Sequence, residues 1–263
     1  MKKIIAMLLV LTMVLCCFAG CGTKGKTLED IKEAGKLVIA TSPDFPPFEY
    51  IDNKAVVGIE IDLMEKICEK LGVELKIEQI GFDSVLPGVQ AGKYDAGVSG
   101  ISVTPAREEN TLFADPYCLA AQAIVVVEGS TIAGKGDLAG KNIAVQSGTT
   151  AESYCMDNNY SISPFEANPD AQTALTTGKV DAWVIDDLTA AEMVKAYNAG
   201  NPDKKLVILD EPMTSEPYAF AFSFGSETLV EEINKIVNEM VKDGTVKAIF
   251  DKYEAPYTAP AVK

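Results

Sequence analysis

Arg107 is the only arginine of the chain; the other 22 of its 23 cationic residues are lysines. A guanidinium can grip a carboxylate or a phosphate with two parallel hydrogen bonds, whereas an ammonium acts as a point charge. Arg107 follows Thr104 and Pro105, a good N-cap and a good first helical residue, so a helix is expected to begin there. This spacing makes Arg107 a candidate for holding an anionic group beside a helix N-terminus. The alternative is a surface ion pair with Glu108 or Glu109.

Two loops of small residues follow predicted strands and precede predicted helices. Ala96–Val98 is typical of the buried end of a strand, and Ser99–Ser102 is expected to form a turn that leaves backbone groups open to a ligand. Ser147-Gly148 follows a second strand and precedes Thr149–Glu152, which has the pattern of a capping box. Each loop is therefore expected to direct a helix N-terminus, with its spare N–H donors, out of the end of a strand.

The composition excludes several kinds of site. The chain has no histidine, which excludes His-dependent triads, His metal sites and imidazole acid–base chemistry. The cysteines beyond residue 21 are far apart and form no Cys-x-x-Cys pair, so we expect no metal and no cofactor. Cys68 lies on one helical face with apolar residues and is expected in the core. A disulfide between Cys118 and Cys155 stays open.

The first 20 residues have the pattern of a secretory signal peptide. Lys2 and Lys3 precede an apolar run from Ile4 to Phe18, and small residues precede Cys21. The run is shorter than the roughly 20 residues that a spanning helix needs. It ends in a sequence similar to the bacterial lipoprotein cleavage box, so Cys21 is expected to be lipidated and residues 21–27 to form a tether. Cleavage without lipidation, followed by secretion, is the alternative.

Charge limits the partners of the chain. Without residues 1–20 the chain has 21 basic and 38 acidic residues, which gives a net charge of −17. Such a surface repels phosphate backbones and anionic lipid head groups, so we expect no nucleic-acid partner. We expect an extracytoplasmic protein that contacts the cell membrane through its lipid anchor alone.

Strands and helices are predicted to alternate along the chain. Strands at 37–41, 73–80 and 95–98 are separated by helices at 58–71 and 82–90, and a second such series begins at 142–145. This order predicts two α/β lobes with a cleft between them: lobe 1 from residues 28–120 and 217–263, and lobe 2 from residues 121–216. Open α/β sheets bind ligands at strand ends. We therefore interpret Phe45, which follows the first strand, as a ligand contact and Phe48 as core.

Several motifs, in their order along the chain, resemble the bacterial family 3 solute-binding proteins, which capture amino acids for ABC importers. They occupy residues 41–49 (Thr-Ser-Pro-Asp-Phe-Pro-Pro-Phe-Glu), 58–63, 95–107, 113–117, 146–150, 178–186 and 243–245. The resemblance extends over essentially all of Leu28–Tyr253. It implies a two-lobed, periplasmic-binding-protein-like fold of type II, with two crossover segments and the ligand between the lobes.

The resemblance also implies how a ligand would be held. Arg107 would hold the α-carboxylate of an amino acid, helped by the backbone N–H groups of Ser102 and Thr150. The carboxylate of Asp186, the hydroxyl of Ser102 and the carbonyl of Gly100 would hold the α-ammonium.

Further contacts are implied for the side chain of the ligand. Phe45 and Phe82 occupy positions that flank it. Two alternatives stay open: Asp186 could instead cap the helix near Leu188, and Phe82 could belong to the core. The implied site is completed by Ser42, Gln146 and Thr149.

One departure from the family pattern bears on the ligand. Members that select basic amino acids usually have an Asp where this chain has Ser42, which favours a polar uncharged ligand. Asp44 lies two residues further on and could still attract a cation. Glu60 stands where Asp is commoner and is expected at the surface.

The implied function is the extracytoplasmic binding component of an ABC importer. It would capture a free amino acid by lobe closure and deliver it to the transmembrane subunits of the permease, without catalysis. One alternative is an enzyme similar to cyclohexadienyl dehydratases, with Asp44, Glu49 or Asp186 as the acid. The other is a sensor ectodomain, which would need a separate signalling partner.

Overall fold

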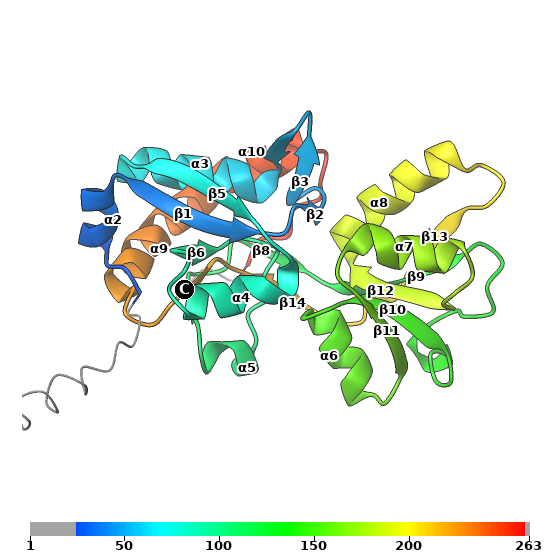
Figure 1. Ribbon diagram of the computed structural model, residues 1–263. Coiled ribbons are helices and arrows are strands. Elements are labelled where there is room, and N and C mark those ends of the chain that lie inside the picture. The colour runs from blue at the N-terminus through cyan, green and yellow to red at the C-terminus, as the bar shows by residue number, and fades with distance from the viewer. Residues whose placement is uncertain (1–24, 261–263) are drawn as a thin grey trace, which may run out of the picture.

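The computed structural model describes residues 25–260 and has two α/β lobes (Figure 1). The predicted signal peptide, Cys21 and most of the predicted tether lie outside the described residues. Each lobe is built on a five-stranded sheet, and the two sheets share no strand. The prediction of a two-lobed α/β fold is therefore confirmed.

The sheet of lobe 1 has the order β5-β1-β6-β15-β7. Strand β1 is parallel to β5 and β6, whereas β15 is antiparallel to β6 and β7. Its strands are β1 (Lys36–Thr41), β5 (Glu74–Gln79), β6 (Ala96–Gly97), β7 (Leu112–Phe113) and β15 (Ala221–Phe222). Its helices are α2 (Leu28–Ala34), α3 (Ile59–Leu71), α4 (Phe82–Gln90), α5 (Pro105–Glu108), α9 (Glu227–Lys242) and α10 (Thr245–Lys252).

The sheet of lobe 2 has the order β11-β10-β12-β9-β13. Strand β10 is parallel to β11 and β12, and β9 is antiparallel to β12 and β13. Its strands are β9 (Gln122–Val127), β10 (Asn142–Gln146), β11 (Ser161–Phe165), β12 (Ala182–Asp186) and β13 (Leu206–Ile208). Its helices are α6 (Thr150–Asp157), α7 (Asn168–Thr176) and α8 (Asp187–Gly200), with the short 3-10 helix η2 (Lys135–Asp137).

The chain passes between the lobes at two strands that lie side by side. Strands β8 (Cys118–Ala120) and β14 (Glu216–Tyr218) pair antiparallel, with Glu216 opposite Ala120 and Tyr218 opposite Cys118. The pairing joins the two segments into one ribbon that connects the lobes (Figure 1).

A small sheet that the sequence analysis does not predict follows β1. Strands β2 (Asp44–Phe45), β3 (Glu49–Asp52) and β4 (Ala55–Val57) pair antiparallel in that order. Asn53 and Lys54, with φ values of 48° and 69°, form the tight turn between β3 and β4. Strands this short have no room for a clear alternation of apolar and polar residues, so the sequence signal is weak.

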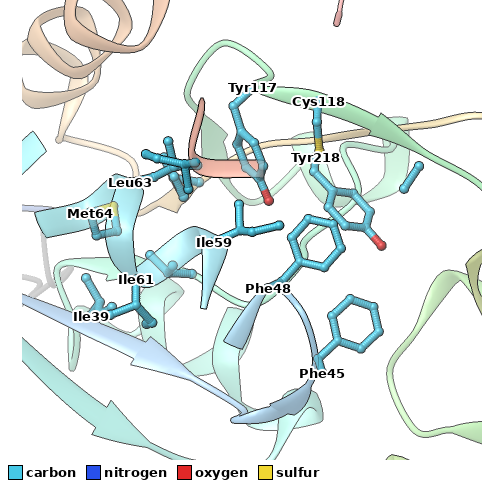
Figure 2. Packing of buried hydrophobic residues seen from close by; sticks show 14 of the residues in the cluster. Ile39, Phe45, Phe48, Ile59, Ile61, Leu63, Met64, Tyr117, Cys118 and Tyr218 are labelled. Atoms are coloured by element: carbon cyan, nitrogen blue, oxygen red, sulfur yellow. The ribbon is translucent and has the colours of Figure 1, made fainter. Parts of the chain in front are cut away.

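An aromatic cluster in lobe 1 extends from the core toward the cleft (Figure 2). The Phe48 ring is stacked 5.8 Å from the ring of Phe45 and meets the ring of Tyr218 edge-on at 5.2 Å. Tyr218 in turn lies 6.5 Å from Tyr117. Burying side chains of this size stabilises the fold by about 1.5–3 kcal/mol each. Phe48 is fully buried, which confirms its predicted place in the core.

The cysteines among residues 25–260 are all free and buried. Cys68 packs in the core, as predicted. Cys118 and Cys155 belong to two different core clusters, and no disulfide joins them. Burial raises the pKa of all three thiols, that of Cys68 to about 11 and that of Cys155 to about 12. They are therefore protonated, poorly nucleophilic core residues.

Candidate functional site

A cavity lies between the lobes, at the ends of β1, β10 and β12, and residues of both lobes line it. All of the predicted site residues line it, together with Asp44 and Ser99. The predicted residues in its wall are Ser42, Phe45, Phe82, Gly100, Ser102, Arg107, Gln146, Thr149, Thr150 and Asp186.

Arg107 reaches the cavity from α5 of lobe 1. Thr104 caps this helix by accepting from the Arg107 backbone N–H, and Pro105 begins it, as predicted. The guanidinium donates to the carbonyl of Ser102 at 2.8 Å and, across the cleft, to that of Gly148 at 3.0 Å. Its central carbon lies 5.8 Å from the centre of the Phe82 ring, within range of a cation–π contact. Arginine has five N–H donors, so three remain after these two bonds.

A buried carboxylate fixes the turn that carries Gly100. Glu60 accepts from the backbone N–H of Gly100 at 2.8 Å and from the hydroxyl of Tyr117 at 2.7 Å. Glu60 is fully buried, so the expectation that it lies at the surface is wrong. Gly100 has φ +54°, and a Cβ there would lie 2.6 Å from the Phe45 ring. Only glycine fits between this carboxylate-held backbone and the aromatic ring.

Glu49 lies beside Glu60 and is also fully buried. Its carboxyl accepts from the hydroxyl of Ser99 at 3.1 Å. Burial, and then the charge of Glu60, raise the pKa of Glu49 well above its usual value. One of the two carboxyls therefore stays protonated, because two adjacent buried charges cannot both be stabilised. Glu49 does not line the cavity, which leaves it out of reach of a ligand.

Asp186 reaches the cavity from the end of β12 in lobe 2. Its Oδ1 accepts from the side-chain amide of Gln122 at 2.8 Å and from the hydroxyl of Tyr218 at 2.5 Å. Asp186 stands at the N-cap position of α8 but makes no side-chain capping bond. Asp187 instead accepts from the backbone N–H groups of Leu188 and Ala121, so the capping alternative for Asp186 is excluded.

The charge state of Asp186 is sensitive to its surroundings. Burial, and then the nearby carboxylate of Glu216, raise the pKa of Asp186 to about 7. Burial also lowers the pKa of Arg107, an effect opposed by the charges of Glu216 and Asp186. The two groups thus stand in one electrostatic environment, although they belong to different lobes.

The start of α6 forms a further wall of the cavity. The hydroxyl of Thr149 caps the helix by accepting from the backbone N–H of Glu152, as the sequence predicts. The carboxylate of Glu152 reaches back to the N–H of Gly148, one residue beyond the position of a standard capping box. Thr150 donates its hydroxyl to Glu216 at 2.7 Å and accepts from Gln122 at 3.1 Å.

Asp44 joins the lobes beside the cavity. Its Oδ2 accepts from the backbone N–H of Asn168 at 2.7 Å and from the Gln146 side chain at 3.2 Å, both in lobe 2. Its Oδ1 accepts from Ser42 at 3.1 Å. Helix α7 has Ala167 at its N-cap, which has no side-chain oxygen to offer. Asp44 of lobe 1 therefore supplies the missing cap of a helix in lobe 2.

Three functional side chains were missed or misplaced by the sequence reading. Glu60 and Glu216 are buried carboxylates that hold other site residues, and nothing in their local sequence marks them. Asp44 stands in a recognised motif, but its partners lie 102 and 124 residues further along the chain. The Ala at the N-cap of α7 was a usable signal, because a helix without its own cap often has one supplied from elsewhere.

Among residues 25–260, no group of three or more acidic or cysteine side chains is placed to hold a metal ion. None of the helices in this part of the chain has the length and apolar character needed to cross a membrane.

Comparisons with known proteins agree on one family. The model of the bacterial extracellular solute-binding proteins, family 3, matches residues 37–256. The arginine-binding extracellular protein ArtP of Bacillus subtilis is 29% identical, over 96% of this chain and 98% of its own.

Solved structures are similar over most of the chain. A mutant of the arginine-binding protein ArgBP from T. maritima is 37% identical, covers 86% of this chain and 98% of its own, and has a TM-score of 0.79. The ancestral amino acid-binding protein AncCDT-1, described as a precursor of cyclohexadienyl dehydratase, is 32% identical. It covers 87% of this chain and 99% of its own, with a TM-score of 0.77.

Replacing Asp44 with Ala tests the cap between the lobes. Loss of the two bonds to lobe 2 should lower the free energy of unfolding by about 1–2 kcal/mol, measured by urea titration. Asp52→Ala is the matched control, because Asp52 is exposed and its side chain accepts a hydrogen bond from the neighbouring Asn53 within lobe 1. The control should stay within about 0.5 kcal/mol of the parent. Equal stability of the two variants would contradict the role of Asp44.

Proposed function

Because the chain belongs to the bacterial extracellular solute-binding proteins of family 3, we propose that it captures a free amino acid and delivers it to the permease of an ABC importer. The observation that carries this proposal is the pairing of Arg107 and Asp186 in one cavity. A free amino acid has a carboxylate and an ammonium on neighbouring atoms. Burying either charge without a partner would cost several kcal/mol.

The hydrogen bonds around the cavity support an orientation for the ligand. Arg107 has three unused donors and would hold the α-carboxylate with the backbone N–H groups of Ser102 and Thr150. On the acceptor side, Oδ1 of Asp186 already has two donors, so Oδ2 would take the α-ammonium. The Ser102 hydroxyl and the Gly100 carbonyl complete that end of the site.

Lobe closure follows from the division of these groups between the lobes. Arg107, Ser102 and Gly100 belong to lobe 1, whereas Asp186 and Thr150 belong to lobe 2. Only a closed cleft satisfies both ends of the ligand, so the ligand favours the closed state by its differential affinity. The transmembrane subunits of the permease would recognise that closed state. For the lobes we propose the boundaries 28–120 with 217–263 and 121–216, which the strand membership of the two sheets supports.

We propose a polar uncharged side chain for the ligand. The Asp44 carboxylate already accepts three hydrogen bonds from Ser42, Gln146 and Asn168, so it offers little to a cationic ligand. Ser42 adds a neutral polar wall, and Phe45 and Phe82 would flank the side chain. Arginine is the second candidate, because similar proteins are named for binding it and Asp44 is a negative charge within the cavity.

We propose that the chain is not an enzyme. Its named relatives are binding proteins, and the neighbour related to cyclohexadienyl dehydratase is itself described as amino acid-binding. A sensor ectodomain would use the same cavity and differs only in its partner. The proposed location is extracytoplasmic, with a lipid anchor at Cys21.

A thermal-shift screen of the twenty amino acids tests the function. A ligand at about 100 times its Kd should raise the melting temperature by about 5–10 °C. Glutamine and other polar uncharged amino acids are expected above arginine, and the α-amide of the best ligand, which lacks the carboxylate, should give no shift. A larger shift with arginine would overturn the side-chain preference alone. No shift with any amino acid, or turnover of prephenate or arogenate, would overturn the proposal.

Arg107→Lys tests the carboxylate clamp. Lysine keeps the charge but loses the fork and the bond to the carbonyl of Gly148, so Kd should rise about 100-fold in calorimetry. Arg107→Ala should abolish binding. The melting temperature of each free variant serves as the folding control. Near-normal affinity in a folded Arg107→Lys variant is the result that the clamp does not allow.

The pKa of Asp186 predicts a pH dependence of binding. The ammonium of the ligand needs the ionised carboxylate, so affinity should be highest above about pH 7 and fall about tenfold per unit below it. The free protein should respond in the opposite sense. Its raised Asp186 pKa means that the folded state holds a proton that the unfolded chain has lost, so stability falls as pH rises toward 7.

Calorimetry between about pH 8 and pH 5.5 measures the first effect. Asp186→Asn should bind weakly, and its weak binding should no longer change with pH near 7. An affinity of the parent protein that stays constant across this range would show that Asp186 does not hold the ammonium.

A further inference from the structure

Glu216 is a buried carboxylate in the ribbon that connects the lobes, and it receives three hydroxyl groups. It is the first residue of β14 and 7% exposed. Its Oε2 accepts from Ser102 of lobe 1 at 2.5 Å and from Thr150 of lobe 2 at 2.7 Å. Its Oε1 accepts from Thr214 at 2.7 Å. One oxygen atom in the connection thus binds a hydroxyl from each lobe.

These contacts determine which way each hydroxyl proton points. A carboxylate has no proton to give, so Ser102 and Thr150 must both donate to Glu216. The Ser102 oxygen, which lines the cavity, is left with lone pairs only. Thr150 also accepts from the side-chain amide of Gln122. Each hydroxyl has one proton and donates it to Glu216, so neither can donate to a ligand.

The hydrogen bonds around Asp186 run in the same direction, from neutral donors to a carboxylate. Gln122 donates to both Thr150 and Asp186, and Tyr218 donates to Asp186 as well. Each of these side-chain donors is directed at a protein acceptor. The side-chain groups left for the ligand are the oxygen of Ser102 and the second carboxylate oxygen of Asp186, and both residues line the cavity.

We propose that Glu216 is a positioning residue that makes this end of the cavity an acceptor-only site, and so selects an ammonium over a hydroxyl or a keto group. The inference rests on the proposed function and deepens it, because it assigns selectivity to a residue that lines no part of the cavity. An ammonium supplies three donors to such a site. A hydroxyl supplies one, and a keto oxygen would meet the acceptors with none.

Closure of the cleft involves the same hydrogen bonds to Glu216. Thr150 approaches Glu216 from lobe 2, and Ser102 approaches it from lobe 1. The acceptor-only site is therefore complete only when both lobes contact the connecting ribbon. Selectivity for the ammonium and closure of the cleft then depend on one carboxylate.

Glu216→Gln is the sharpest test, because the two side chains have the same shape. The amide nitrogen of glutamine must donate. Thr214 and Thr150 already accept from Gln122, so the amide is expected to donate to Ser102, whose proton then turns toward the ligand. Affinity for the amino acid that emerges from the thermal-shift screen should fall roughly 10- to 100-fold in calorimetry. Affinity for its α-hydroxy acid, which has the same side chain, should stay unchanged or rise.

The ratio of the affinity for the amino acid to that for its α-hydroxy acid distinguishes a positioning role of Glu216 from a general loss of structure. A merely structural role of Glu216 would weaken both ligands equally, and an unchanged or equally lowered pair of affinities would overturn the inference. Glu211→Gln is the matched control, because Glu211 is exposed and pairs with Lys135. Its ratio should equal that of the parent.

If Glu216→Gln does not give a cooperative thermal melt, Glu216→Asp is measured in its place. Aspartate keeps an acceptor-only group on a shorter side chain, so the ratio of the amino acid affinity to the hydroxy acid affinity should equal that of the parent. A changed ratio in Glu216→Asp would overturn the inference. If the parent protein binds no amino acid, the proposed function fails and the inference fails with it. Normal binding by the parent with an unaltered ratio in Glu216→Gln sinks the inference alone.

Discussion

The arrangement of the molecule depends on the cost of leaving a charge without a partner inside a closed cleft. Arg107 approaches the cavity from one lobe and Asp186 from the other, and no hydrogen bond or ion pair joins them in the described part of the chain. Each is instead held by neutral partners: carbonyls for the guanidinium, and an amide and a hydroxyl for the carboxylate. These partners hold the charged groups in place without neutralising them. The capacity to neutralise is left for a ligand that carries both charges.

Much of the fold could be predicted from the sequence because its signals are local. Helix α4 has the predicted bounds, 82–90, and the motif around Arg107 has its predicted N-cap and proline. The ten predicted site residues follow strand ends or begin helices, so the rules for open α/β sheets bring them to one cavity. Their individual roles toward a ligand stay predictions.

What could not be predicted depends on partners far apart in the sequence. Glu60 looks like an ordinary acidic residue near a helix start, yet it is fully buried because Gly100 and Tyr117 satisfy its oxygens. Glu216 is ordinary in its local sequence and gains its place from Ser102, which lies 114 residues earlier. A buried charge whose hydrogen-bond donors lie far away in the sequence leaves no local pattern. Neither composition nor periodicity therefore predicts that it is buried.

The strand order of the first sheet also bears on how the protein is made. Strand β15 lies between β6 and β7, although it is the last strand along the chain. All strands of the second sheet fall within residues 122–208, so that sheet has every strand it needs before β15 has been synthesised. The first sheet lacks one of its interior strands until residues 221–222 have been synthesised. Lobe 1, which contains the first strand of the chain, can therefore complete its sheet only after most of the polypeptide has been synthesised.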